Sequence, residues 1–225
     1  MHNLGMGLIT CILSLFAGDS PKSETPRQQY EALLKRYDAP LSTFVNNQVL
    51  AKKSTKPFLT LARENPSDPA SVDALNWVVT HTLFTPVAGE AMDMLARDHI
   101  QNEKLAVILP ELTRLYGGSF EPLEKLFRAA SEKSKRHDAR GRGCLNLGRY
   151  LVMHKERVEF IRIQRKMFDS GLPVPFNLEP KETDQDLLRI KMEAQSLLLR
   201  VISEFSDVKG LAESAKETLA KLDKK

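Results

Sequence analysis

Two histidines and two aspartates on predicted helices could bind a metal ion or act as a general base. They are His81, Asp93, Asp98 and His99. Their neighbours are an ordinary mixture of apolar and charged residues, so we interpret Asp98 and His99 as a solvated helix end. The chain has only 2 cysteines and 5 histidines, and the sequence shows no cluster of the kind that zinc needs. We expect no metal, no cofactor and no catalytic residue.

Cys144, the only cysteine beyond the N-terminal apolar run, lies between Arg142 and Arg149. Nearby cations would lower the pKa of an exposed thiol and make it reactive. The position of Cys144 on an apolar stripe instead predicts a small buried side chain. The neighbouring glycines lack the preceding strand and the Gly-Lys-Ser/Thr ending of a phosphate-binding loop. We therefore expect Gly143, Cys144 and Gly148 to let two helices approach closely.

The most basic part of the chain, residues 133–166, could bind an acidic protein, an anionic lipid or a polyanion. Helix faces of this kind are also often simply solvated. Few aromatic residues accompany the basic ones, so we do not expect a nucleic-acid partner. The candidate binding surface consists of five basic residues and one aromatic residue from the segment that follows: Arg142, Arg149, Lys155, Arg157, Arg162 and Phe176.

The N-terminus contains an apolar run, residues 4–17, and no charged residue precedes Asp19. As a helix, such a run would span about 21 Å, less than the roughly 30 Å hydrocarbon core of a bilayer. A secretory signal peptide fits better than a membrane span. A lipidated Cys11 and a buried N-terminal helix are the alternatives. We predict a signal peptide over 1–18, a linker over 19–26 and a helical-repeat domain over 27–225.

Amphipathic helical patterns follow one another from about Arg27 to Lys225, separated by brief turns. No long run of alternating β-branched residues is present, and 42% hydrophobic residues are enough to build a core. The net charge of +4 permits weak attraction to acidic surfaces. The sequence therefore predicts an all-α array of antiparallel helical hairpins, tetratricopeptide-like or α-solenoid, with eight to ten helices.

Local signals predict where several helices begin and end. We expect the residues 52–55 to interrupt a helical pattern and Pro110 to kink or break a helix. Thr85 is expected to cap the helix that Pro86 opens. Ser119 is expected to cap the helix that begins directly after Ser119 itself.

The longest helix is expected from Asp138 to about Phe168. A proline-rich loop over residues 169–185 should follow it, and loops of this length often pack against the fold or serve function. Trp77 is expected in the core rather than in a groove.

Several segments resemble known families. Residues 194–208 and 211–222 resemble the end of a tetratricopeptide array. Residues 62–79, 91–100 and 143–151 are similar to the helical N-terminal region of a bacterial family of exported proteins, in which the helices precede a thioredoxin-like, thiol-peroxidase-type domain. The resemblance covers roughly residues 28–208. The chain stops at Lys225 and has no Cys-x-x-Cys motif, so the resemblance implies the helical module without redox activity.

The patterns and the resemblance together predict a non-catalytic protein–protein interaction module of the bacterial cell envelope. The expected partner is an unidentified protein, with a thioredoxin-like protein as one candidate, and membrane contact is expected only through an uncleaved N-terminal segment. The second hypothesis is an accessory module that docks a separate thioredoxin-like redox protein. The third is a hydrolase or metal enzyme whose site is assembled from distant residues.

Overall fold

The computed structural model describes residues 24–37, 44–116, 120–168 and 182–223. Within these ranges all regular secondary structure is helical, which confirms the predicted all-α array of eight to ten helices. The nine helices are α1 (Pro26–Tyr37), α2 (Phe44–Glu64), α3 (Pro69–His81), α4 (Pro86–Asp98), α5 (Leu105–Tyr116), α6 (Glu121–Lys133), α7 (His137–Phe168), α8 (Asp184–Glu204) and α9 (Leu211–Asp223).

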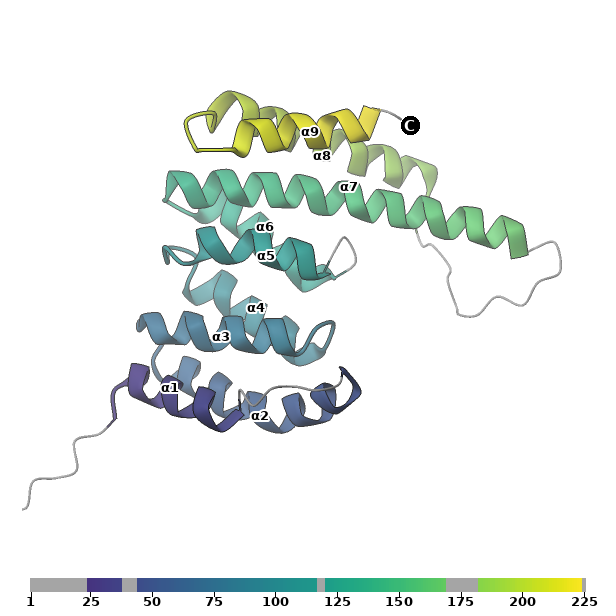
Figure 1. Cartoon of the computed structure of the whole chain (residues 1–225). Helices are drawn as coiled ribbons and strands as arrows, with labels where there is room; N and C mark the ends of the chain where they lie inside the picture. The colour runs from purple at the N-terminus through teal and green to yellow at the C-terminus, as the bar shows by residue number, and fades with distance from the viewer. Residues whose placement is uncertain (1–23, 38–43, 117–119, 169–181, 224–225) are drawn as a thin grey trace, which may run out of the picture.

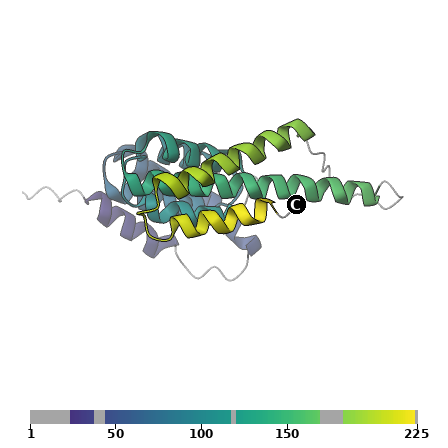
Figure 2. The same cartoon turned by 90° about the horizontal axis from the view of Figure 1, so that it is seen from above.

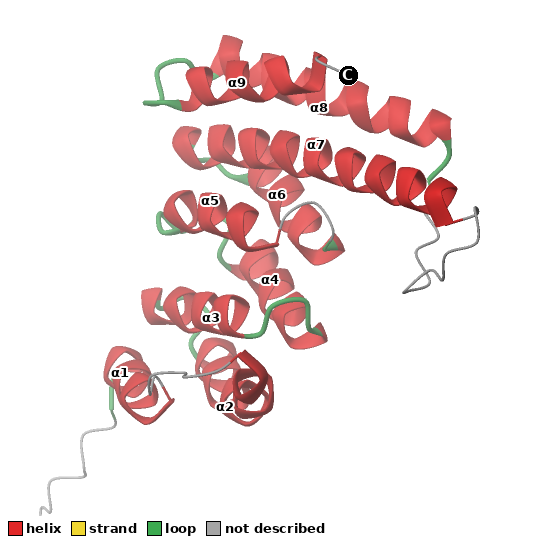
Figure 3. Ribbon diagram, turned by 45° about the vertical axis from the view of Figure 1, so that its right-hand side comes forward, coloured by secondary structure: helices red, strands yellow, loops and turns green. Residues whose placement is uncertain are grey.

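The helices stack in two layers, with the odd-numbered helices in one and the even-numbered helices in the other (Figures 1 and 3). Along the odd layer each helix contacts the next, from α1 through α3, α5 and α7 to α9. Helices α3, α5 and α7 begin at Pro69, Leu105 and His137. That spacing is typical of two-helix units, which repeat roughly every 30–45 residues.

One hydrophobic core runs the length of the stack, from Phe58 in α2 to Leu222 in α9. Its largest fully buried side chains include Phe58, Phe127 and Phe205, which belong to the start, the middle and the end of the stack. Trp77 is 6% exposed, and its ring stacks on Phe58 with 4.1 Å between ring centroids. The prediction that Trp77 is a core residue is confirmed.

Glycines on α7 allow close approach to its two neighbours. A Cβ atom on Gly143 would lie 2.5 Å from the Ser131 nitrogen and 2.8 Å from the Ala130 carbonyl carbon, both in the backbone of α6. A Cβ on Gly148 would lie 3.0 Å from the Leu198 side chain of α8. The predicted close approach of helices at Gly143 and Gly148 is confirmed.

Local sequence fixes several helix starts. Thr25 and Gln28 form a capping box, in which the Gln28 N–H donates to Thr25 Oγ1 and the Thr25 N–H donates to Gln28 Oε1. Thr85 accepts from the Ala88 N–H at 3.2 Å, which confirms it as the cap of α4. Such caps satisfy backbone donors that the first turn leaves unpaired.

Two expectations about helix boundaries are wrong, and of the kink or break expected at Pro110 the structure excludes the break. Helix α2 continues through residues 52–55, where Ser54 and Thr55 are buried rather than part of a turn. Helix α5 is not broken at Pro110, because its buried leucines hold it in the core at the loss of one backbone hydrogen bond. Phe120, not Ser119, occupies the cap position of α6, and its side chain makes no capping hydrogen bond.

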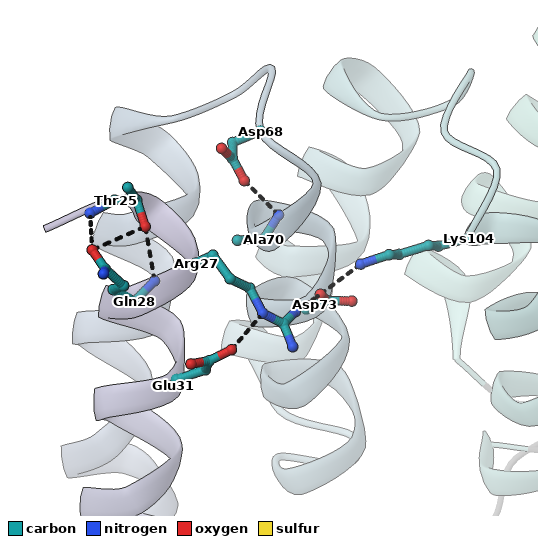
Figure 4. A network of polar contacts seen from close by, with 8 residues as sticks. All are labelled: Thr25, Arg27, Gln28, Glu31, Asp68, Ala70, Asp73 and Lys104. Atoms are coloured by element: carbon teal, nitrogen blue, oxygen red, sulfur yellow. Dashed lines mark hydrogen bonds and ion pairs between the residues drawn. The ribbon is translucent and has the colours of Figure 1, made fainter.

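A polar network joins the first three helices of the odd layer (Figure 4). The Asp73 carboxylate on α3 accepts from Arg27 of α1 at 2.8 Å and from Lys104, just before α5, at 2.6 Å. Deeper in the stack, Thr113 of α5 donates to the fully buried Asn146 of α7 at 2.8 Å. These bonds span neighbouring hairpins and therefore help to fix the order of the stack.

Candidate interaction surface

Helix α7 is the longest helix of the described chain and confirms the prediction of a long helix ending near Phe168. Its C-terminal part projects beyond the ends of α5, α6 and α9 (Figures 1 and 2). The start of α8 supports this part from one side. His154 Nε2 lies 3.1 Å from the Glu182 carboxylate, and Arg162 pairs with Asp184. The other sides of the projecting part are not covered by any described helix.

Exposed apolar side chains concentrate on α7 and α8. Among the described residues, eight large hydrophobic side chains are exposed, and six of them belong to these two helices. The other two are Val107 on α5 and Phe84 in the turn between α3 and α4. The six are Met153, Phe160 and Ile163 on α7, and Leu188, Met192 and Leu199 on α8.

The six side chains form two stripes. Met153, Phe160 and Ile163 lie within about 80° of one another around α7, and we call them the α7 stripe. The other three lie within about 40° of one another around α8, and we call them the α8 stripe. Helix α8 contacts α7 through Ala194 and Leu198 at Gly148, roughly 120° around the helix from the α8 stripe. The α8 stripe therefore faces away from α7.

Two arginines of the candidate basic surface, Arg142 and Arg149, lie one above the other on the side of α7 that carries the α7 stripe. Both are partly buried, and the Arg142 Nε has no hydrogen-bond partner among the described residues. Burial lowers the pKa of the Arg149 guanidinium, and the nearby Glu217 carboxylate of α9 opposes that shift. Unlike Lys155 and Arg162, neither arginine forms an ion pair with a described residue.

The remaining members of the basic surface do not join Arg142 and Arg149. Lys155 forms an ion pair with Glu159 at 2.5 Å, and its side chain is only 12% exposed. Arg162 pairs with Asp184 and donates to the Glu182 carbonyl. Lys155 and Arg162 lie about 140° around α7 from the other two. Arg157 is exposed. Phe176 and most of the predicted proline-rich loop lie outside the described residues, and α8 begins at Asp184.

The residues first considered for metal binding do not converge. His81 contacts the Trp77 carbonyl through Nδ1 at 2.8 Å and stacks on the Trp77 ring. His99 caps the end of α4 but is only 5% exposed, so the expectation of a solvated helix end is wrong for this side chain. Core packing around the α4 terminus buries it, and burial lowers its pKa. In the described ranges no group of three or more His, Cys, Asp or Glu could hold a metal ion.

Cys144 is fully buried, as predicted from its position on the apolar stripe. Burial raises the pKa of the thiol, and this outweighs the opposite influence of Arg200 and Arg140. A neutral, inaccessible thiol is a poor nucleophile. Cys144 therefore contributes packing volume between α7 and its neighbours.

The sequence contains a signal for the α7 stripe that the predictions above do not include. The apolar positions Cys144, Leu147 and Leu151 define one stripe of α7, and all three are buried. Phe160 and Ile163 fall outside that stripe by roughly half a helical turn. Two apolar stripes on one helix indicate two packing faces. The stack covers the stripe of Cys144, Leu147 and Leu151, and it leaves the α7 stripe uncovered.

Among the helices that the structure describes, none combines the length and the apolar character needed to cross a membrane. No protein-family model, curated protein or solved structure matches the chain.

Proposed function

We propose that this chain is a non-catalytic protein-interaction module and that the α8 stripe is a docking surface for its partner. The observation that supports this proposal is the concentration of six of the eight exposed large hydrophobic side chains of the described residues on α7 and α8. Contiguous exposed apolar surface is costly in water and commonly marks an interaction site.

The form of the α8 stripe suits a helical or extended segment of another protein. Leu188, Met192 and Leu199 are 57%, 61% and 52% exposed and follow each other along one side of the helix. Aligned anchors separated by one or two turns are the usual means by which helices bind partner proteins. Leucine and methionine side chains also adapt their shape to a partner more easily than β-branched ones.

The partner is proposed to reside in the cell envelope. This part of the proposal rests on the apolar residues 4–17, which fit a signal peptide and lie outside the described residues. The basic pair Arg142 and Arg149 favours acidic groups on the partner, since ion pairs within the described fold do not neutralise either guanidinium.

The proposal is tested by crosslinking the chain in envelope extract and identifying the captured proteins by mass spectrometry. The wild type is compared with Leu188→Glu/Met192→Glu, and with Val107→Glu as the matched control, because Val107 is 78% exposed on α5. We expect a specific partner that the double variant loses and the control retains. Equal capture by all three proteins would refute the docking role of α8. A thioredoxin-like protein among the specific partners would identify the module as an accessory to thiol chemistry.

A further inference from the structure

The α7 stripe lies on the part of α7 that extends beyond the stack, and it needs a partner of its own. Phe160 and Ile163 are 60% and 58% exposed, and with Glu156, Glu159 and Arg162 they line a hollow of about 410 Å³ on α7. Met153 and Phe160 are seven residues apart and Ile163 follows three residues later, so the three fit the a, a and d positions of a coiled-coil heptad. We propose that this seam pairs with the α7 seam of a second copy of the chain in an antiparallel dimer.

An antiparallel arrangement makes the seam self-complementary. A two-fold axis between Phe160 and Ile163 places Phe160 of each copy against Ile163 of the other, so the Phe160–Ile163 contact forms twice. The two residues are separated by about 4.5 Å along the helix axis. The same symmetry directs the two helical stacks to opposite ends of the paired helices.

The charges beside the seam specify the same arrangement. With Phe160 opposite Ile163, the flanking Glu159 of one copy lies opposite Lys166 of the other, and symmetry repeats the pair. Lys166 is exposed, and Glu159 keeps part of its carboxylate accessible beside Lys155. A parallel pairing would instead place Glu159 beside Gln164 and lose both ion pairs. Charge complementarity therefore favours a second copy in the antiparallel register.

The dimer is expected to be weak and concentration-dependent. Two layers of Phe160 and Ile163 bury less surface than the 1,200–2,000 Å² of a standard stable interface, so we expect a dissociation constant on the order of 10–100 µM. This inference does not depend on the proposed function, because the α7 stripe and the α8 stripe are different surfaces and dimerisation requires no other protein.

Sedimentation equilibrium of the purified full chain over about 1–500 µM tests the dimer directly. We expect Phe160→Ser to weaken self-association at least tenfold, as is typical of a central aromatic anchor. Val107→Ser is the matched control on α5 and should leave self-association unchanged. Circular dichroism confirms that both variants fold. A wild type that remains monomeric over the whole range would overturn the proposal, and would leave another protein or the chain's own residues 169–181 as the partner of the α7 stripe.

A charge exchange tests the register. Glu159→Lys and Lys166→Glu should each weaken the dimer about threefold to tenfold, since each removes two symmetric ion pairs and creates like-charge contacts. The double variant should return self-association to within about threefold of the wild type. A dimer that resists Phe160→Ser, or a double variant that is weaker than both single variants, would exclude the antiparallel α7 pairing.

Discussion

Replacing Gly143 with alanine tests the close approach of α6 and α7. The added Cβ would lie 2.5 Å from the Ser131 nitrogen and 2.8 Å from the Ala130 carbonyl carbon. Non-bonded atoms of this kind prefer about 3.5–4.0 Å, so the two helices must separate by roughly 1 Å. Both obstructing atoms belong to the backbone, and no side-chain rotation can relieve the contact.

The expected loss of stability follows from two opposing effects. Overpacking a closed core costs about 1–3 kcal/mol, and the upper end applies because backbone must move. Alanine favours the helix over glycine by about 1 kcal/mol. We therefore expect Gly143→Ala to lower the free energy of unfolding by about 2 kcal/mol. For a chain of this length that corresponds to a decrease in Tm of about 4–8 °C.

Gly148→Ala is the matched control, because it adds the same methyl group to the same helix. Its Cβ would lie 3.0 Å from two atoms of the Leu198 side chain, which can rotate away. We expect Gly148→Ala to stay within about 0.5 kcal/mol of the wild type or to exceed it. Urea and thermal unfolding followed by circular dichroism measure both variants. A Gly143→Ala variant as stable as the wild type would refute the close α6–α7 contact.

Three further perturbations have defined outcomes. Thr113→Val removes the donor to the buried Asn146 side-chain carbonyl and should lower the free energy of unfolding, measured in urea, by about 1–3 kcal/mol. The double variant Thr113→Val/Asn146→Leu should recover much of that loss. Equal losses in the two variants would contradict a buried hydrogen bond. Burial lowers the pKa of His99, so the unfolded chain binds its proton first and stability falls as pH decreases below about 6.5. His99→Gln should flatten the pH dependence of Tm between about pH 6.5 and 5, and an unchanged slope would exclude His99 as its source. Cys144 should resist alkylation in the folded chain and react when the chain unfolds. Peptide mass spectrometry measures the alkylation, and rapid labelling of the native protein would contradict the burial of the thiol.

Local signals in the sequence determined most of the helices. Apolar residues at intervals of three and four predicted α3 to α9, since a helix buries one side and the side repeats every 3.6 residues. Thr85 and the following proline located the start of α4, because a cap and an N1 proline act within a single turn. The burial of Cys144 followed from the same periodicity.

The tertiary structure decided what depends on neighbours distant in sequence. Residues 52–55 read as a break, but the packing of α2 carries the helix through them, because buried contacts outweigh weak local preferences. The lengths of α5, α6 and α9, compared with α7, determine that the second apolar stripe of α7 is left uncovered. The basic residues of α7 looked equivalent in sequence, yet Lys155 pairs with Glu159 of its own helix and Arg162 with Asp184 of α8, while Arg142 and Arg149 face another side. Periodicity alone identifies the sides of a helix, whereas only the packing of the stack determines which side remains available to a partner.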